Sequence, residues 1–208
     1  MIDKNKIKIL IACEYSGTVR KEFRRLGFDA WSCDILDSED NSKHHIKDDV
    51  LKHIDNGWDL IIAHPPCTHL AVSGARHFKE KIKDGRQQQG IDFFMNIVDA
   101  DCPRIIIENP ICIMSTKYRK PDQIIQPWQF GDKFQKTTCL WIKGMPGLKH
   151  TKIVSKGEFI TFPSGKRMSK WYSNKSGQGK LRSKTFPGIA KAMAEQWGKF
   201  LEEDVSFD

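Results

Sequence analysis

The chain has 208 residues, and its 34 Lys and Arg against 26 Asp and Glu give a formal net charge of +8. This length predicts a single domain with a core large enough to fold without disulfide or metal support. No apolar run approaches the ~20 residues of a membrane span and no secretory signal is recognisable, so we expect a cytoplasmic protein without membrane contact. The positive charge favours a polyanionic partner, because each phosphate contact releases condensed counterions.

The six cysteines show no metal-binding spacing. No two of them form a Cys-x-x-Cys pair, and no matching His-x-x-x-His pattern occurs. We therefore expect no metal site and free thiols in a reducing cytoplasm. Three of the cysteines are expected to act as small buried hydrophobes, namely Cys102, Cys112 and Cys139.

Apolar strands and amphipathic helices alternate through the first half of the chain. Continuous apolar runs predict strands, at residues 7–12, 28–34, 58–63 and 104–107. Apolar residues at helical spacing predict helices, at residues 18–26, 50–54 and 84–99, the first of them ended by Gly27. The polar stretch 36–49 is expected to be a loop. Together these elements predict an α/β fold, a mostly parallel sheet with helices on both faces.

The sequence changes character in its second half. Residues 126–144 predict an antiparallel hairpin region, with a strand at 137–142. Residues 149–184 are basic and rich in Gly and Ser, which is typical of a small appended lobe rather than of a regular element. A final amphipathic helix is predicted over 186–201.

Reactive residue types follow each predicted strand of the first half. The first strand ends in Cys13-Glu14-Tyr15-Ser16-Gly17 and the second at Asp34, while the later ones end in His64-Pro65-Pro66-Cys67 and Glu108-Asn109-Pro110. In an open parallel sheet the ligand site lies outside the carboxyl ends of the strands. The four strand ends therefore predict one shared site.

The residue types suggest separate roles within that site. A helix starting near Ser16 would offer free N–H groups to an anionic or polar ligand group, and Asp34 is placed to accept hydrogen bonds from ribose hydroxyls. The two prolines before Cys67 hold its thiol rigidly, and nearby cations or helix dipoles would lower the pKa of that thiol. Burial would keep Glu108 partly protonated, as suits an acid or hydrogen-bond donor.

An ordered chain of motifs resembles the DNA (cytosine-5)-methyltransferase family over nearly the whole chain. Pro65-Pro66-Cys67-Thr68 is similar to the family's Pro-Pro-Cys-Gln catalytic loop, and Glu108-Asn109-Pro110 is similar to its Glu-Asn-Val motif. Gln135-Lys136-Thr137-Thr138 resembles the Gln-x-Arg-x-Arg strand, and Thr185-Phe186-Pro187-Gly188 resembles the start of the last helix. The resemblance implies a Rossmann-like methyltransferase fold that uses S-adenosyl-L-methionine.

The resemblance also implies a division of the chain and a role for each motif. Residues 1–148 would form the cofactor-binding catalytic core, 149–184 a short target-recognition segment, and 185–208 a helix that packs back onto the core. The Cys67 thiolate would add to carbon 6 of cytosine while Glu108 holds the ring, so that carbon 5 takes the methyl group. The cofactor would be held by Glu14, Tyr15, Ser16, Gly17, Asp34, Ile35, Asp49 and Pro65. The substrate would be held by Pro66, Thr68, Asn109, Gln135, Lys136 and Thr138.

The basic segment is the expected contact with DNA. Cations mixed with aromatic residues suit backbone contact and base stacking more than base-edge reading, so we expect low or short sequence specificity. The residues expected there are Lys166, Arg167, Lys170, Trp171 and Arg182. The base has to be flipped out of a duplex or presented in a single strand. By analogy with compact family members we expect a monomer, with a dimer as the other option, in a bacterial or phage-infected bacterial cell.

Three other interpretations remain open at the level of sequence. His64-Pro65-Pro66-Cys67 also resembles the Asp-Pro-Pro-Tyr loop of methyltransferases that modify exocyclic amino groups, although Cys67 cannot stack on a base. The short recognition segment would permit an enzyme that acts on a pyrimidine nucleotide through the same thiolate addition. The thin glycine loop and the missing arginines of the Gln-x-Arg-x-Arg strand would suit a nucleic-acid-binding protein on a catalytically decayed scaffold.

Overall fold

A computed structural model describes residues 3–170 and 183–204 and shows an α/β fold built on a seven-stranded sheet. The strand order is β3-β2-β1-β4-β5-β7-β6. The parallel strands are β1 (Lys8–Ala12), β2 (Asp29–Asp34), β3 (His45–Lys47), β4 (Leu60–Ala63) and β5 (Ile105–Asn109). Strand β7 (Thr138–Lys143) runs antiparallel between β5 and β6 (Gln123–Ile125). The predicted mostly parallel sheet is confirmed, and its order is consistent with a Rossmann-like methyltransferase topology.

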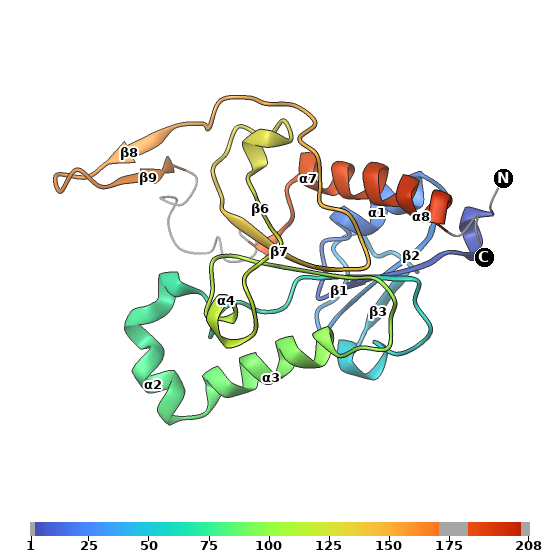
Figure 1. Ribbon diagram of the computed structural model, residues 1–208, viewed down its shortest axis with the longest axis horizontal. Coiled ribbons are helices and arrows are strands. Elements are labelled where there is room, and N and C mark those ends of the chain that lie inside the picture. Colours follow the sequence, from blue (N-terminus) through green and yellow to red (C-terminus); the bar gives the residue numbers. More distant parts are fainter. Residues whose placement is uncertain (1–2, 171–182, 205–208) are drawn as a thin grey trace.

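Helices cover both faces of the sheet (Figure 1). One face packs against α1 (Thr18–Arg25) and the C-terminal helical segment, and the other face packs against α3 (Arg86–Val98). Within β1, Ile9 and Ile11 point to the first layer while Leu10 points to the second. The strands are continuously apolar because successive side chains enter two different cores.

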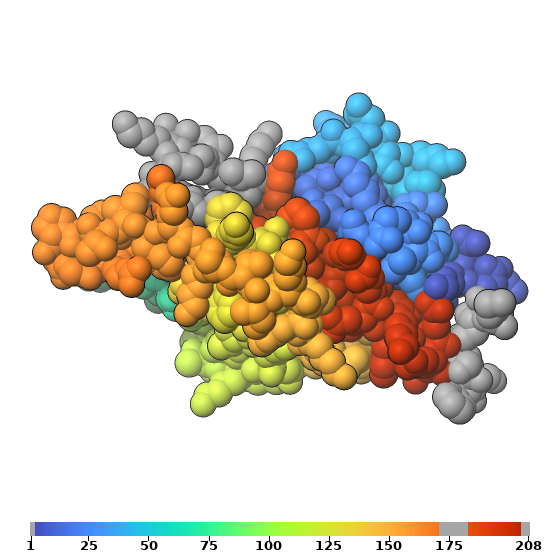
Figure 2. Space-filling view, turned by 90° about the horizontal axis from the view of Figure 1, so that it is seen from above, coloured from blue at the N-terminus to red at the C-terminus, as the bar shows by residue number. Residues whose placement is uncertain are grey.

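The C-terminal helical segment consists of α7 (Pro187–Ala192), a π-helical turn η5 (Met193–Trp197) and α8 (Gly198–Asp204). Its buried apolar side chains recur every fourth residue, at Ile189, Met193, Trp197 and Leu201. In a pure α-helix that spacing would drift around the axis by about 40° per step. The wider π turn offsets the drift and keeps the stripe on the sheet. Figure 2 shows this segment lying against the N-terminal part of the chain.

The structure corrects several of the predicted elements and adds others between them. The expected loop 36–49 was wrong in part, because residues 45–47 form β3. This strand is short, polar and at the sheet edge, so its sequence carries no apolar pattern. The short helix expected at 50–54 is a 3-10 turn, η2 (Val50–Lys52). The hairpin expected over 126–144 begins earlier in the chain, because the partner of β7 is β6, at residues 123–125. The other added short elements are η1 (Lys4–Lys6), η3 (Val72–His77), α2 (Phe78–Lys83), α4 (Met114–Lys117) and η4 (Pro127–Gln129).

The basic segment, residues 149–184, first packs along the core and then extends away from it. The backbone of Lys152 forms a bridge with Phe130, and the backbone of Lys149 exchanges two hydrogen bonds with the Gln196 side chain. The antiparallel hairpin of β8 (Phe159–Thr161) and β9 (Arg167–Ser169) then projects from the body of the protein (Figures 1 and 2). Within the described residues no helix is long and apolar enough to cross a membrane.

Candidate functional site

A cavity of about 630 Å³ opens at the carboxyl ends of the parallel strands. Both residues predicted to be catalytic line it, Cys67 and Glu108. So do most residues predicted to bind cofactor, namely Glu14, Tyr15, Ser16, Asp34, Ile35, Asp49 and Pro65. Four of the predicted substrate residues also line it, namely Pro66, Thr68, Asn109 and Lys136. The four strand ends therefore meet at one site.

Strand register places His64 beside Glu108. Because Ala63 of β4 lies opposite Ile107 of β5, the next residue on each strand is opposite the other. His64 Nδ1 and Glu108 Oε2 are 3.0 Å apart, with the two side chains only 7% and 12% exposed. Burial raises the pKa of Glu108, but the hydrogen bond from His64 and the charge of Lys136 outweigh it and leave the pKa below its usual value. Glu108 is therefore a carboxylate at neutral pH, and the expectation of a partly protonated acid is wrong for the free protein.

The Cys67 thiol is not activated in the free protein. Its pKa is raised by burial and by the negative charge of Glu108, while Lys136 and Lys81 act in the opposite direction. The expectation that nearby cations lower this pKa is therefore wrong in its net direction. Removing the negative charge of Glu108, or bringing a further cation near the thiol, would favour its nucleophilic form.

The loop that carries Cys67 is held at both sides. Asn109, which is 1% exposed, donates from its side-chain amide to the Pro65 carbonyl oxygen over 2.9 Å. Lys81 Nζ donates to the carbonyl oxygen of Thr68 over 2.6 Å. The backbone N–H groups of Leu70 and Ala71 both donate to the Cys67 carbonyl oxygen. These bonds fix the position of the thiol before any ligand binds.

The amino terminus of α1 is closed by Glu14. The Glu14 carboxylate accepts hydrogen bonds from the backbone N–H groups of Val19 at 2.7 Å and Arg20 at 3.2 Å. The expectation that this helix end offers those N–H groups to a ligand is therefore wrong. Gly17 does not line the cavity; it precedes α1 with φ of 67°, and a Cβ there would meet the Arg20 guanidinium at 2.3 Å. Glycine at this position admits a buried arginine rather than a phosphate.

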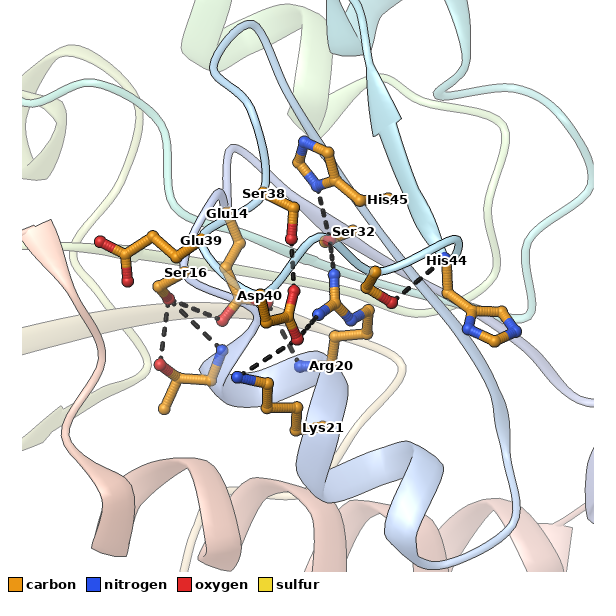
Figure 3. Close-up of polar contacts among 12 residues, drawn as sticks. Glu14, Ser16, Arg20, Lys21, Ser32, Ser38, Glu39, Asp40, His44 and His45 are labelled. Atoms are coloured by element: carbon orange, nitrogen blue, oxygen red, sulfur yellow. Dashed lines mark hydrogen bonds and ion pairs between the residues drawn. The ribbon is translucent and has the colours of Figure 1, made fainter.

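That arginine fastens the loop beside the cavity (Figure 3). Arg20 is 1% exposed, and its guanidinium donates to Ser32 Oγ at 2.7 Å and to Asp40 at 2.5 Å. Ser32 also contacts His45 Nδ1 at 2.8 Å, and the other ring nitrogen of His45 lies 2.9 Å from the Leu36 carbonyl oxygen. Buried charges persist only when they are paired in this way. The network ties α1, β2 and β3 to the loop that carries Ile35 and Leu36.

The far end of the cavity from Glu108 combines carboxylates with apolar side chains. Asp34 and Asp49 lie close enough to Cys13 to raise its pKa further, after burial as the larger cause. Ile35 is 72% exposed and Leu36 44% exposed at the same rim. Carboxylates stabilise a cation and accept from hydroxyl groups, and exposed apolar side chains cover a flat ring. This end fits a ligand that joins a positive charge, a sugar and a heteroaromatic base.

The remaining predicted residues lie elsewhere. Gln135 and Thr138 are not among the residues that line the cavity, and the Thr138 hydroxyl donates to the Lys136 carbonyl oxygen instead. Lys166, Arg167 and Lys170 lie on or beside the β8–β9 hairpin. Arg167 lies over the Phe159 ring at 4.7 Å, and Lys170 pairs with Glu158 at 2.6 Å. Trp171 and Arg182 fall outside the residues that the structure describes.

The sequence places His64 and Pro110 at the shared site without a role of their own, and it does not indicate Lys81 or Phe93. His64 and Lys81 contact the two predicted catalytic motifs, and Phe93 and Pro110 line the cavity. A register argument could have found His64, because β4 and β5 are neighbouring apolar strands that both end at a polar residue. The sequence around Lys81 and Phe93 does not indicate that they belong to the site, because they lie on α2 and α3 and not at the end of a strand.

Among residues 3–170 and 183–204, no three His, Cys, Asp or Glu side chains are grouped to hold a metal ion. The sequence matches no protein-family model and no curated protein.

Proposed function

We propose that this protein is a DNA (cytosine-5)-methyltransferase that uses S-adenosyl-L-methionine and forms a covalent adduct between Cys67 and carbon 6 of the target base. The observation that carries the proposal is a single cavity with a rigid thiol and a buried carboxylate at one end and a carboxylate-rich apolar rim at the other. The fold is then a Rossmann-like methyltransferase fold.

The rim fits the cofactor chemically. S-adenosyl-L-methionine joins a cationic sulfonium, ribose hydroxyls and an adenine ring, and about 630 Å³ is within the range of small-molecule sites. Asp34 and Asp49 would hold hydroxyl or cationic groups, and Ile35 and Leu36 would cover the adenine. Bound there, the cofactor supplies an electrophilic methyl group to the end of the cavity that holds Cys67.

The other end of the cavity fits a pyrimidine. Cys67 supplies the nucleophile for carbon 6, and Glu108 faces the same space, where its carboxyl group can accept from the exocyclic amine of cytosine and, once protonated, donate to N3. Lys136 lies near the position where the resembling strand carries its first arginine, and its charge acts on both Glu108 and Cys67. Lys136 therefore takes over the cationic role in the absence of the family's arginine at this position.

The surroundings of the cavity support a nucleic-acid substrate. A second cavity of about 1000 Å³ shares Thr185 with the first and is lined by residues of the β8–β9 hairpin and the start of α7. Its lining combines three lysines, two of them paired with acids, with two acidic and two aromatic residues, namely Lys133, Lys170, Lys184, Asp132, Glu158, Phe134 and Phe186. Cations and aromatic rings beside a base-sized site suit a flipped or single-stranded base with its flanking backbone.

Product analysis tests the proposal. The protein is incubated with S-adenosyl-L-methionine and duplex or single-stranded DNA, the DNA is digested, and the nucleosides are separated by mass spectrometry. We expect 5-methylcytosine, lost in Cys67→Ser and retained in Cys102→Ser. Cys102 is a matched control, because it is a buried cysteine outside the cavity whose thiol donates to carbonyl oxygens that a serine hydroxyl can also reach. N4-methylcytosine as the product, or no methylated base at all, would overturn the proposal.

A further inference from the structure

Residues 183–186, which we call the strap, lie between the two cavities. Ser183 and Thr185 line the first cavity. Lys184, Thr185 and Phe186 line the second, so Thr185 belongs to both walls. The strap contains the last two residues of the basic segment and leads directly into α7. One short stretch of chain therefore separates the space assigned to the cofactor from the space assigned to nucleic-acid backbone.

Two polar contacts tie the strap to the loops that form the cofactor end of the first cavity. The Tyr15 hydroxyl and Ser183 Oγ are 3.2 Å apart, and Lys184 Nζ donates to Glu39 Oε2 over 2.6 Å. The backbone N–H of Glu39 donates in turn to the Tyr15 carbonyl oxygen over 3.0 Å. The strap, the loop after β1 and the rim loop, residues 35–40, are thus joined around this end of the cavity.

The rim loop is held from two sides by neighbouring residues. Asp40 pairs with the buried Arg20, while Glu39 points away from that network (Figure 3). On the strap side both partners are exposed, Lys184 by 31% and Glu39 by 39% of the side chain. An ion pair as exposed as this shifts an equilibrium by only about 2- to 5-fold. The strap side is therefore the side on which the rim loop is released most easily.

The charges of the second cavity give Lys184 another partner to choose. Three lysines and two acids line this cavity. Glu158 pairs with Lys170, and Asp132 accepts from a backbone N–H at the start of α7. Lys133 and Lys184 are then the cations of the lining, within the described part of the chain, that a phosphate group would meet. An ammonium group binds phosphate through charge-assisted hydrogen bonds.

We propose that the strap is a latch on cofactor exchange, and that a backbone phosphate of the nucleic acid releases it by taking Lys184 from Glu39. The inference rests on the proposed function and adds an order of events to it. In the free protein the Lys184–Glu39 pair holds the strap across the cofactor end. With nucleic acid in the second cavity this tie is lost, so the spent cofactor leaves while the nucleic acid stays bound.

The latch makes the two partners of Lys184 competitors, and linkage fixes the signs of the effects. Glu39→Gln and Lys184→Met both remove the tie, so both should speed release of the cofactor. Their effects on nucleic acid should be opposite. Glu39→Gln frees Lys184 for phosphate and strengthens binding, while Lys184→Met removes the phosphate contact and weakens it.

The first test measures the dissociation rate of radiolabelled S-adenosyl-L-homocysteine, chased with unlabelled compound at constant ionic strength. It is run with and without a duplex of A·T pairs only, which offers no cytosine. We expect the duplex to raise the wild-type rate about 2- to 5-fold. Glu39→Gln should show the raised rate without duplex and no further rise with it. Glu202→Gln should behave as wild type, because the Lys4–Glu202 pair has the same 2.6 Å separation and similar exposure but lines neither cavity.

Two outcomes of this test would overturn the inference. One is a duplex that leaves the wild-type rate unchanged or slows it. The other is an equal acceleration by inorganic phosphate at the same phosphate concentration, which would assign the second cavity to a free anion and not to nucleic acid.

The second test needs neither cofactor nor activity. Hydrogen exchange of the peptide that covers the rim loop reports the Glu39 N–H, which is bonded to the Tyr15 carbonyl oxygen. We expect faster exchange in Glu39→Gln, in Lys184→Met and in wild type with the A·T duplex, and no change in Glu202→Gln. Duplex affinity should rise about 2- to 5-fold in Glu39→Gln and fall in Lys184→Met.

Exchange and duplex affinity that are the same in Glu39→Gln as in wild type would overturn the inference even in an active methyltransferase. If the wild type binds neither the cofactor nor DNA, the proposed function falls and the release by nucleic acid falls with it. The exchange rates of the two variants then still decide whether Lys184 and Glu39 hold the rim loop.

Discussion

Lys81 donates a 2.6 Å hydrogen bond from Nζ to the carbonyl oxygen of Thr68, the residue that follows Cys67. Lys81 is 8% exposed, although the chain around it in α2 is exposed. A buried ammonium group next to the loop does two things. It holds the backbone of the turn, and its charge acts to lower the Cys67 pKa against burial and Glu108.

Lys81→Met should loosen this loop and make the thiol less reactive. Methionine preserves the packing of the side-chain stem, so the loss is that of one charge-assisted hydrogen bond, about 1–2 kcal/mol of stability. Without the nearby cation the pKa of Cys67 rises further, so alkylation of Cys67 by iodoacetamide at pH 8 should slow. Peptide mass spectrometry measures that rate. Lys83→Met, from an exposed position on the same helix, is the control; equal rates in the two variants would contradict the assignment.

Glu108→Gln should have the opposite effect on the same thiol. Burial is the main cause of the raised Cys67 pKa and the Glu108 charge is the second, so removing that charge lowers the pKa of the thiol. We expect alkylation of Cys67 to become several-fold faster at pH 8 while methylation is lost. Glu80→Gln, which changes an exposed acid paired with Arg86, should leave both unchanged. Slower alkylation in Glu108→Gln would show that the two groups do not interact as described.

Asp40→Asn tests how much the ion pair between Asp40 and the buried Arg20 contributes to stability. Burial opposes ionisation of Asp40, but hydrogen bonds from Ser38, Arg20 and Lys21 outweigh it and hold the Asp40 pKa well below its usual value. Because the Asp40 side chain is 24% exposed, we expect a loss of about 1–2 kcal/mol, less than for a fully buried pair.

The pH dependence of that loss has a definite sign. A depressed pKa contributes stability that is complete above the unfolded-state value and is lost as the pH falls through the folded value. Urea unfolding should therefore show a constant gap between wild type and Asp40→Asn at pH 5–8 and a shrinking gap below about pH 4. Asp37→Asn, an exposed acid in the same loop, is the control. A gap that widens in acid would contradict the network.

At position 13 we expect the glycine variant to be more stable than the alanine variant, which is the reverse of the usual order. Its φ is 60°, a left-handed conformation that costs a non-glycine residue roughly 1–2 kcal/mol. Cys13→Gly should therefore be about 1 kcal/mol more stable than Cys13→Ala in thermal unfolding. Cys33 is the matched control, a buried cysteine of β2 whose φ is not positive, and there glycine should be the less stable variant. The same order at both positions would contradict the strained backbone at Cys13.

Most of the fold follows from local patterns in the sequence. The predicted helix 18–26 matches α1, because its start, its apolar spacing and the stop at Gly27, with φ of 94°, are all encoded within ten residues. The strands of the two-sided sheet were visible as apolar runs. The two edge strands β3 and β6 were not, because a short edge strand is defined by its pairing, here with β2 and with β7, and not by its own residues.

The members of the site could be predicted more fully than its electrostatics. Parallel strands end at one edge, so Asp34, Cys67 and Glu108 had to converge. The pKa directions of Cys67 and Glu108 depend on Lys81, Lys136 and His64, which reach the cavity from three other parts of the chain. The turn of Glu14 back onto α1 is a local contact, five or six residues along the chain, but no spacing rule used for the sequence indicates it.

Covalent trapping tests the central claim most directly. DNA containing 5-fluorocytosine, as a duplex and as a single strand, is incubated with the protein and S-adenosyl-L-methionine and then run on a denaturing gel. Fluorine at carbon 5 cannot be eliminated, so addition of Cys67 followed by methyl transfer leaves a stable adduct. We predict a shifted band that requires the cofactor, vanishes in Cys67→Ser and persists in Cys102→Ser. No band on either substrate, together with no thermal stabilisation by the cofactor, would contradict the account and favour a nucleic-acid-binding protein on an inactive scaffold.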